Sequence, residues 1–426
     1  MKVYEKVYDY FVNQIQKKSL KSGDKMPSLR ETEKLLGVSR TSVETAYLQL
    51  SADGYIYSVE KVGYFISDTV DSVAIIKPEE KEIKKQTEKI YKYDLSTIGE
   101  DKEVSCLQLW RRYMKSALRQ EDRLLSYGDN QGEKDLREEI CKHIRKTRNI
   151  ICSADEVVIG AGFQNLLQIL VALIPGEKTI SFPTKDFADG ATTFKNAGFQ
   201  VSYRNKESHV IYVTPQYMTL WGDVMPMKRR RELVEHAKVN NHLLIEDDYQ
   251  NEFVFSQKPT PSLYALNGGE NTAFLGSFSR VLLPSVRISY LVLPKGIKED
   301  YLKIKDLYNQ TASKAEQIAL TQFLRDGHLN RHIKKMKRFY QDKRSLMEQE
   351  IEKAFSSKAE IMIGDSGMEF GLRFKNYDKK KLHENSQVKT TILDEKDNEL
   401  LLLLSCSKIP ENEIHEAINS LSDVII

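Results

Sequence analysis

Residues 23–67 read GDKMPSLRETEKLLGVSRTSVETAYLQLSADGYIYSVEKVGYFIS, and they contain two helix starts separated by a short turn. Ser28 stands three residues before Glu31, which is the spacing of a capping box at the start of a helix. Ser39, beyond the turn at Gly37, is the expected N-cap of the next helix. The apolar face of that second helix comprises Val43, Ala46, Tyr47 and Leu50. Two helices joined in this way predict a helix-turn-helix.

The flanking residues complete a small domain. Upstream, apolar residues recur at steps of three and four, as expected of an amphipathic helix: Tyr4, Val7, Tyr8, Phe11 and Ile15. Downstream, the strand-like runs YIYSV (55–59) and YFIS (64–67) flank the turn EKVG (60–63). Three helices followed by a two-stranded ribbon predict a winged helix-turn-helix over residues 1–68.

This domain carries groups that suit DNA binding. A recognition helix meets the major groove at its N-terminus, where short hydroxyl side chains and cations can contact bases and phosphates. The candidate DNA-binding residues are Arg30, Ser39, Arg40, Thr41 and Ser42, with Lys61 and Gly63 in the wing. The alternative is a winged helix that docks protein, because residues 1–68 contain 10 Lys and Arg against 9 Asp and Glu. A salt-dependent affinity for DNA separates the two interpretations.

The composition of the whole chain sets broader limits. The 426 residues are too many for one compact core, and 40% of them are hydrophobic, so we expect two or three folded domains. The charged stretch at residues 69–92 is interpreted as a linker. No apolar run approaches the roughly 18 residues of a membrane span, and the N-terminus lacks the apolar segment of a secretory signal. The four cysteines lie far apart and are typical of free thiols in a reducing compartment, so we expect a cytoplasmic protein.

Residues 93–426 alternate between helix-like and strand-like segments. The helix-like segments are WRRYMKSALRQ (110–120), EKDLREEICKHIRK (133–146), FQNLLQILVALI (163–174) and MKRRRELVEHAKV (227–239). The strand-like segments are EVVIG (156–160), KTISF (178–182), SHVIYVTP (208–215), HLLIEDD (242–248), TAFLGSF (272–278) and ISYLVLP (288–294). Such alternation predicts an α/β domain with a mostly parallel sheet, which binds ligands at the carboxyl ends of its strands.

Two of these strand ends carry groups that suit a phosphorylated pyridine. Asp247 can pair with a protonated pyridine nitrogen, and Tyr249, two residues later, can hydrogen-bond a ring hydroxyl. The next strand end supplies hydroxyls and a guanidinium for a phosphate, from Ser277, Ser279 and Arg287. One alternative is an acidic strand end and a serine-rich turn that bind no ligand. Another is a magnesium site at residues 246–248.

Both parts of the chain resemble known families. Residues 23–67 are similar to the GntR-family winged helix in the runs PS-x-R, L-G-V-S-R, A-Y-x-x-L and D-G-Y-I. Residues 93–426 resemble fold-type I aminotransferases in the form fused to GntR domains, the MocR regulators. The matching stretches include YGDNQGEKDLREEI, VVIGAGFQNLLQIL, YVTPQYMTLWGDVM and LLIEDDYQNEF. The resemblance implies a bacterial transcription regulator that binds operator DNA as a homodimer and senses a small-molecule effector. It also implies a smaller C-terminal α+β subdomain.

The resemblance assigns roles to individual residues of the pocket. By this resemblance the cofactor is contacted by Asp247 at the pyridine nitrogen, Tyr249 at the ring hydroxyl, Phe187 stacked on the ring, and Ser277 and Arg287 at the phosphate. Tyr127 matches a tyrosine that reaches the phosphate bound by the partner subunit, which again implies a homodimer.

The departures from the family pattern concern the catalytic groups. The chain has Ser279-Arg280 where the family has Ser-Lys, so the Schiff-base lysine is replaced by Arg280. A guanidinium stays protonated at physiological pH and cannot act as the amine nucleophile. Four further positions depart: Leu403 where an arginine binds the substrate carboxylate, Phe163 where a small hydroxyl residue is usual, and Tyr217-Met218 in place of a His-Gln pair.

From these departures we expect a regulator with a catalytically degenerate aminotransferase-like domain and no enzyme activity. The alternative is an active aminotransferase that depends on pyridoxal phosphate. The cofactor is left open: pyridoxal 5'-phosphate or pyridoxamine 5'-phosphate held non-covalently, with Arg280 pairing with a phosphate or a ligand carboxylate, or no cofactor in a cleft used by another effector. His328 and His332 have a spacing that can bind zinc on a helix, but the sequence places no third ligand, so we expect no metal site.

Overall fold

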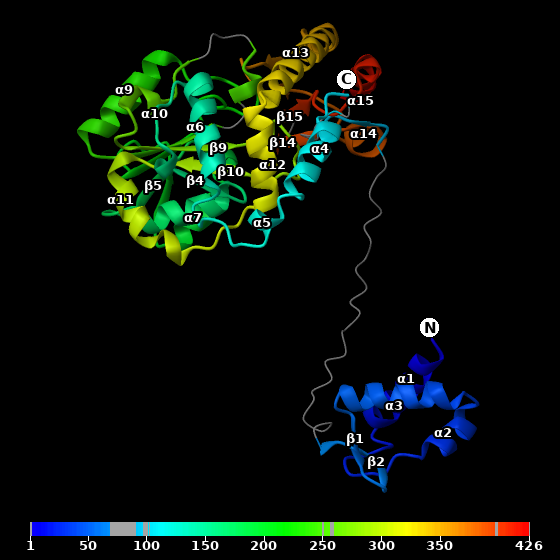
Figure 1. Ribbon diagram of the computed structural model, residues 1–426. Coiled ribbons are helices and arrows are strands. Elements are labelled where there is room, and N and C mark those ends of the chain that lie inside the picture. The colour runs from blue at the N-terminus through cyan, green and yellow to red at the C-terminus, as the bar shows by residue number, and fades with distance from the viewer. Residues whose placement is uncertain are drawn as a thin grey trace. The chain divides into compact units, whose positions relative to one another are not determined.

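The computed structural model describes residues 2–68, 91–96, 101, 103–248, 251–255, 260–396 and 399–425. The chain forms two compact units, Met1–Glu88 and Lys89–Ile426, and each is treated by itself (Figure 1). Most of the predicted linker, residues 69–90, lies outside the described residues. Among the helices of the described residues, none has the length and apolar character that crossing a membrane requires.

The first unit is the predicted winged helix-turn-helix. Its elements are α1 (Val3–Gln16), α2 (Leu29–Leu36), α3 (Arg40–Ala52), β1 (Ile56–Val59) and β2 (Gly63–Ile66). The capping box at the start of α2 is present: the Ser28 amide donates to Glu31 Oε2 at 2.7 Å, and the Glu31 amide donates to Ser28 Oγ at 3.3 Å. Strands β1 and β2 pair antiparallel, which confirms the ribbon.

Aromatic side chains fill the core of this unit. The Tyr47 ring makes edge-on contacts with Phe11 at 5.5 Å and with Tyr64 at 5.2 Å between centroids. Its hydroxyl, although buried, lies 2.8 Å from Thr32 Oγ1 and 2.8 Å from the Pro27 carbonyl oxygen. Because these hydrogen bonds offset the cost of desolvating the hydroxyl, Tyr47 can hold α3 against α1 and the wing.

The second unit is built on a seven-stranded sheet. Its strands are β4 (Val157–Gly160), β5 (Thr179–Phe182), β6 (Gln200–Tyr203), β7 (Val210–Val213), β8 (Leu243–Asp247), β9 (Thr272–Ser277) and β10 (Ser289–Val292). Their order is β4-β10-β9-β8-β7-β5-β6. Only β10 runs antiparallel to its two neighbours within this sheet. The mostly parallel sheet that the sequence predicts is therefore confirmed.

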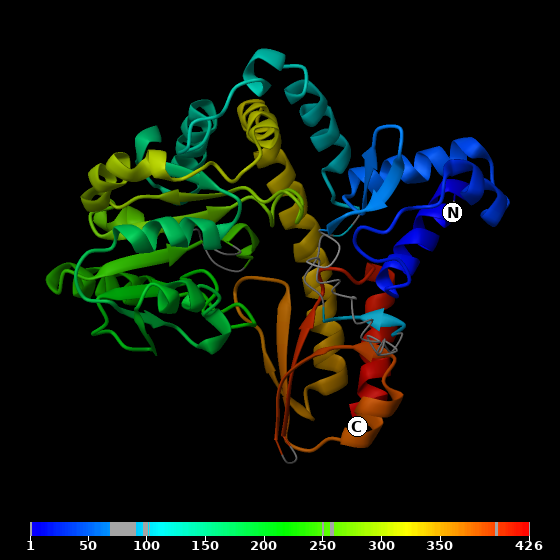
Figure 2. The same ribbon diagram turned by 90° about the horizontal axis from the view of Figure 1, so that it is seen from below.

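Helices cover both faces of this sheet (Figures 1 and 2). They are α4 (Leu107–Ala117), α5 (Glu121–Leu124), α6 (Lys134–Arg148), α7 (Phe163–Leu173), α8 (Ala191–Asn196), α9 (Met227–Val239), α10 (Leu263–Asn267), α11 (Lys295–Ile304) and α12 (Lys314–Arg325). Val158 of β4 packs into a core with α7, α8 and α11, whereas its neighbours Val157 and Ile159 pack with α4, α6 and α12. Strands buried on both faces explain why their sequences are almost continuously apolar.

A smaller α+β subdomain follows, as the resemblance implies. Its elements are α13 (His328–Phe355), β11 (Ala359–Met362), β12 (Glu369–Phe374), α14 (Lys379–Asn385), β13 (Val388–Lys389), β14 (Thr391–Lys396), β15 (Glu399–Ser405) and α15 (Ile414–Ile425). Four strands form an antiparallel sheet in the order β11-β12-β15-β14, and β3 (Tyr93–Asp94) pairs with β13. The long helix α13 runs beside these strands (Figure 2).

Candidate functional site

The N-terminus of α3 presents three exposed residues, Ser39, Arg40 and Thr41. Ser39 Oγ accepts from the Ser42 amide at 3.4 Å and lies 2.9 Å from Ser42 Oγ, so both hydroxyls are occupied in capping the helix. Arg40 is exposed, and its Nε donates to Glu44 Oε1 at 2.9 Å along the same helix. Thr41 is exposed as well. Arg40 and Thr41 are thus the groups of this set that can reach a base or a phosphate without breaking the cap.

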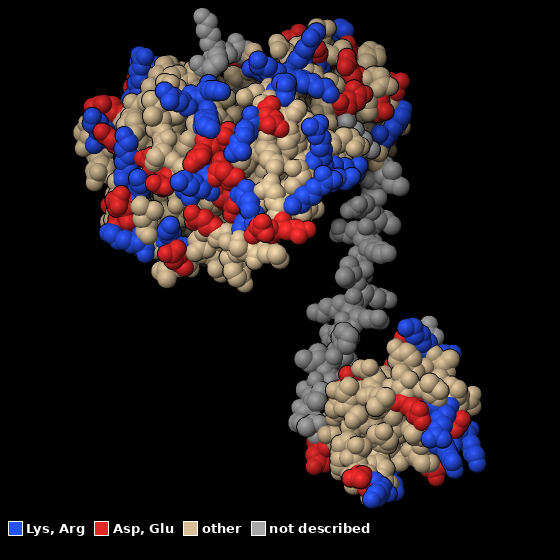
Figure 3. All heavy atoms as spheres, viewed as in Figure 1, with Lys and Arg blue, Asp and Glu red and all other residues tan. Residues whose placement is uncertain are grey.

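The remaining candidate DNA-binding residues lie on two other elements of the same unit. Arg30 is exposed in the first turn of α2. Lys61 lies in the β1–β2 turn and Gly63 begins β2, and both have positive φ angles, 61° and 129°. The visible face of this unit carries lysine and arginine near acidic groups and not as a continuous basic surface (Figure 3). DNA binding by this unit would therefore depend on individual contacts and not on a broad positive surface.

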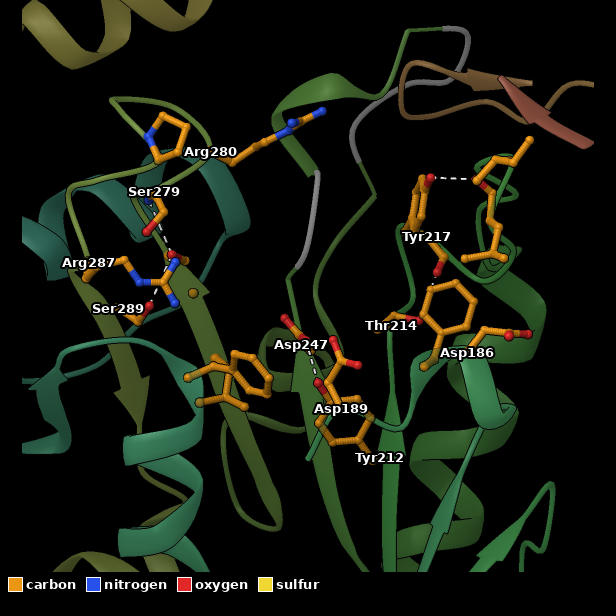
Figure 4. Close-up of a pocket in the computed structure, with 18 residues that line it drawn as sticks. Asp186, Asp189, Tyr212, Thr214, Tyr217, Asp247, Ser279, Arg280, Arg287 and Ser289 are labelled. Atoms are coloured by element: carbon orange, nitrogen blue, oxygen red, sulfur yellow. Dashed lines mark hydrogen bonds between the residues drawn. The ribbon is translucent and has the colours of Figure 1, made fainter. Parts of the chain in front are cut away.

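In the second unit a cavity of about 490 Å³ lies at the carboxyl ends of the central strands (Figure 4). Its lining contains both signs of charge and several hydroxyls: Phe163, Asp186, Phe187, Asp189, Tyr212, Thr214, Tyr217, Leu220, Asp247, Leu275, Gly276, Ser277, Ser279, Arg280, Pro284, Arg287, Ser289 and Leu403. Six of the seven predicted pocket residues that the structure describes are brought together here, and Tyr127 is the exception. Tyr249 lies outside the described residues.

One side of the cavity is acidic. Asp247, the last residue of β8, accepts a hydrogen bond from the hydroxyl of Tyr212. Burial and the charge of Asp247 raise the pKa of Tyr212 well above its usual value, so the phenol stays a donor. Asp189 lies beside this pair and faces the cavity (Figure 4). This side can therefore bind a protonated nitrogen.

The two acidic neighbours of Asp247 are engaged elsewhere. Glu246 accepts from the Tyr264 amide at 3.0 Å, and Asp248 pairs with Arg148 at 2.5 Å in a buried ion pair. Within the described residues, no group of three or more His, Cys, Asp and Glu side chains is placed to hold a metal ion. The three consecutive acidic residues therefore do not converge on one point, as a magnesium site would require.

The opposite side of the cavity suits an anion. Ser277 Oγ accepts from Ser289 Oγ at 3.0 Å and from the Ser279 amide at 3.3 Å. The N-cap of α7 is Gly162, with φ 97°, and a Cβ atom there would lie 3.1 Å from Arg287 Nη2. The glycine therefore leaves room for the guanidinium beside the N-terminus of α7. A helix N-terminus, a guanidinium and serine hydroxyls together form a cradle for a phosphate or a carboxylate.

Arg280 does not join this cradle. Its side chain extends away from Arg287 (Figure 4), and its Nη2 lies 4.0 Å from Glu369 Oε1 and 3.7 Å from Met368 Sδ. The guanidinium also lies over the Phe253 ring, 5.7 Å from its centroid. The position that the resemblance gives to the reactive lysine is therefore occupied by a cation directed toward the C-terminal subdomain.

Glu369 links two of the departures from the family pattern. It is fully buried on β12, and its Oε2 accepts from the Tyr217 hydroxyl and from the Met368 amide, both at 2.8 Å. Arg280, Tyr217 and Glu369 thus form one cluster that connects the wall of the cavity to the C-terminal sheet. Glu369 is not among the pocket residues predicted from the sequence. The available signal was a lone carboxylate inside the apolar run MEFGLRF, because a buried charge requires a partner.

The other predicted residues have simpler surroundings. Phe187 lines the cavity, with its ring 6.0 Å from that of Tyr217 between centroids. Leu403 and Phe163 also line it, and both present apolar surface. Tyr127 is completely exposed and does not line the cavity of its own chain.

The lining determines which chemistry the cavity can perform. Within the described residues, Arg280 and Arg287 are its cations and it contains no lysine, so no amine is available to attack an aldehyde. The groups for a phosphate and for a pyridine nitrogen are both present, at Arg287 and at Asp247. A vitamin B6 phosphate therefore fits the two ends of this cavity as a non-covalent ligand.

Comparison with known proteins agrees with this architecture. The family model for bacterial regulatory proteins of the gntR family matches residues 3–66, and the model for aminotransferase class I and II matches residues 99–213 and 202–397. Among solved structures, an archaeal alanine:glyoxylate aminotransferase is similar with a TM-score of 0.69 and 20% identity, over 81% of this chain and 92% of that one. That likeness shows the fold of the second unit.

Curated relatives match both units together. The uncharacterized HTH-type transcriptional regulator YhdI of Bacillus subtilis is 32% identical over 87% of this chain and 83% of its own length. The HTH-type pyridoxine biosynthesis transcriptional regulator PdxR of Corynebacterium glutamicum is 28% identical over 77% of this chain and 74% of its own. The chain therefore belongs to the family of HTH-type transcriptional regulators in which a gntR-family domain is joined to an aminotransferase class I and II domain.

Proposed function

We propose that this protein binds operator DNA as a homodimer and alters that binding when a small molecule occupies the cavity of its second unit, without catalysing amino-group transfer. The observation that carries this proposal is Arg280. It stands where the resemblance places the reactive lysine, and it lies next to Glu369 and not in the phosphate cradle.

DNA recognition is assigned to the N-terminus of α3 and to the wing. Arg40 and Thr41 are exposed there, and the Ser39–Ser42 cap holds the first turn of the helix in a fixed conformation. A guanidinium at this point can donate two hydrogen bonds to guanine, and Lys61 in the wing can contact the DNA backbone.

The proposed effector has a negative group at one end and a protonated nitrogen at the other. Arg287, Ser277 and the N-terminus of α7 would hold the negative group, and Asp247 would hold the nitrogen. Pyridoxal phosphate and pyridoxamine phosphate both satisfy this pattern, and Phe187 could stack on their ring. When bound, such a cofactor supplies an aldehyde or an aminomethyl group attached to a pyridine ring. This chain's own residues only bind and orient it.

The absence of catalysis follows from two side chains. Arg280 cannot release a proton to act as a nucleophile, and Leu403 gives a substrate carboxylate no cationic partner at that position. The pocket keeps the affinity for a ligand and lacks the groups that would turn it over.

Homodimerisation is assigned to the second unit. Tyr127 and Leu125, in the segment after α5, expose essentially their entire side chains. Large apolar groups exposed in adjacent positions are typical of an interface. Tyr127 is fully exposed and does not line the cavity of its own chain, so it is available to contact a partner subunit.

The test uses purified full-length protein. Binding of pyridoxal phosphate and of pyridoxamine phosphate to the protein is measured by calorimetry. An operator is selected from random DNA, and its affinity for the protein is measured without ligand and with each of the two ligands. We expect ligand binding that dialysis reverses, loss of it in Arg287→Ala, and a ligand-dependent change in DNA affinity. Amino-group transfer from an amino acid to a keto acid by the wild-type chain would contradict the proposal.

A further inference from the structure

A second cavity, of about 440 Å³, opens at the carboxyl ends of β5, β6 and β7. Tyr212 and Thr214 line both this cavity and the one described above, so the two are adjacent. The second cavity is lined by Ser181, Phe182, Pro183, Thr184, Arg204, Asn205, Lys206, Ile211, Tyr212, Val213, Thr214, Met218, Thr219, Met225, Arg229 and Leu233. Within the described residues this lining contains no Asp or Glu.

The charges and the apolar surface of this cavity are separated. Arg204, Lys206 and Arg229 are exposed at its rim. Its apolar surface is contributed by Ile211, Val213, Met225 and Leu233. Neither Arg204 nor Arg229 forms an ion pair with any described residue, and the nearest carboxylate to Lys206 is that of Glu207, at 3.7 Å. The first cavity carries both signs of charge, whereas this one carries three positive charges only.

The rim is held in place by specific hydrogen bonds. Arg204 has a left-handed backbone conformation with φ 53°, which a long side chain adopts only when the surroundings impose it. Its amide donates to the Phe182 carbonyl at 3.0 Å, and its Nε donates to the Pro183 carbonyl at 3.3 Å. The carbonyl of Lys206 lies 2.9 Å from His236 Nε2 on α9. Arg204 therefore combines a strained backbone with a place in the lining of the cavity, and strain of this kind is concentrated at binding sites.

We propose that this cavity is a second small-molecule site, which binds an organic anion with a carboxylate or phosphate head and an apolar body. The head lies against Arg204, Lys206 and Arg229, and the body lies on the apolar floor. The occupant also contacts the Tyr212 ring, whose hydroxyl holds Asp247 in the first cavity. The two sites therefore share one wall and are chemically distinct.

The experiment measures binding of phenyl phosphate to the full-length protein by calorimetry. We expect Arg229→Ala and Lys206→Ala each to weaken binding about tenfold or more, because each removes a charge-assisted contact. Arg231→Ala is the matched control: Arg231 is also exposed on α9, but it does not line the cavity, and binding should not change. Arg287→Ala should also leave binding at this site unchanged, since Arg287 lines only the first cavity.

The comparison ligands separate the parts of the proposal. Benzoate distinguishes a carboxylate head from a phosphate head. The site is supported if phenyl phosphate or benzoate binds, with weaker binding in Arg229→Ala and Lys206→Ala and unchanged binding in Arg231→Ala and Arg287→Ala. Benzyl alcohol, which lacks the charge, and inorganic phosphate, which lacks the apolar body, should both bind at least tenfold more weakly. Loss of binding in Arg287→Ala with full binding in Arg229→Ala would place the anion in the first cavity and overturn the proposal. Failure of both phenyl phosphate and benzoate to bind would overturn it too.

Discussion

The cluster of Arg280, Glu369 and Tyr217 allows a quantitative test of how the C-terminal subdomain is attached to the cavity. We consider Glu369→Gln, which keeps the shape of the side chain and removes its charge. Glu369 is 0% exposed and Arg280 is 17% exposed, so the carboxylate has no access to solvent and the guanidinium has little.

The expected cost is the sum of two effects. The bonds from the Tyr217 hydroxyl and the Met368 amide to a carboxylate become bonds to a neutral amide oxygen, a loss of about 1 kcal/mol each. Arg280 also loses its counter-charge at 4.0 Å, and the lower desolvation cost of the neutral amide offsets part of that loss. We expect Glu369→Gln to lower the free energy of unfolding by about 3 kcal/mol.

The assay is urea unfolding followed by tryptophan fluorescence. Both tryptophans, Trp110 and Trp221, belong to the second unit, so the signal reports its unfolding alone. Glu360→Gln is the matched control, because Glu360 pairs with Arg373 on the same sheet but both side chains are exposed, at 61% and 42%. An exposed pair contributes at most about 1 kcal/mol.

A double-mutant cycle with Arg280→Met tests the coupling directly. Methionine fills the space beside Met368 and Phe253 without a charge. If Arg280 and Glu369 stabilise each other, the double variant should lose less unfolding free energy than the two single variants lose together. The difference should be about 1 kcal/mol or more. Additive losses, or a cost of Glu369→Gln no larger than that of Glu360→Gln, would refute the coupling that we infer between this pair.

Four further predictions concern DNA, assembly, cofactor chemistry and pH. Arg40→Ala should weaken specific operator binding by about 1–3 kcal/mol in anisotropy titrations and leave the oligomeric state unchanged; an unaltered affinity and sequence preference would count against it. A chain that lacks residues 1–92 should sediment as a dimer at micromolar concentration, and a monomer would contradict the assignment of the interface to the second unit. Borohydride should trap no pyridoxal phosphate at position 280 of the wild type, whereas Arg280→Lys should give a trapped adduct without measurable transamination; Arg280→Lys that binds no cofactor would reassign the cleft to another effector. Burial raises the pKa of Glu246 from 4.5 to about 7, so the folded state keeps a proton that the unfolded state releases. The wild type should therefore lose stability relative to Glu246→Gln as the pH rises from about 4.5 to about 7, and a pH-independent difference would show that Glu246 titrates normally.

Local signals in the sequence are sufficient to predict most of the helices and strands. The capping box at Ser28, the N-cap at Ser39 and the spacing of apolar residues depend on neighbours within one or two helical turns, and the structure contains each helix that they predict. The short apolar runs of the second unit correspond to strands for the same reason. Strand β6 was missed because its residues, QVSY, are only partly buried. The antiparallel direction of β10 was also missed, since no local pattern encodes the direction of a strand.

The candidate site was predictable only in part, because sequence gives positions along the chain and not directions in space. Asp247 and Ser277 follow from strand ends, since the carboxyl ends of parallel strands meet at one edge of the sheet. Arg287 reaches the same edge because it precedes β10, which runs antiparallel to its neighbours. The direction of the Arg280 side chain depends on Glu369, which lies in another sheet. The hydrogen bond from Tyr212 to Asp247 likewise joins two different strands. Partners of this kind are fixed by tertiary packing, and no spacing rule relates them.

Arg280 has two consequences for the site. An arginine offers no nucleophilic amine for an aldehyde at this position, and it brings a cation to the buried carboxylate of Glu369. The planar guanidinium of Arg280 lies over the Phe253 ring and also lies near Glu369. A lysine has a single compact ammonium group and could not make both contacts in this way. Tyr217 belongs both to the wall of the cavity and to this cluster, so a ligand that moves Tyr217 alters the same contacts that hold β12. Under the proposed function, these contacts would couple occupation of the cavity to the position of β12 in the C-terminal subdomain.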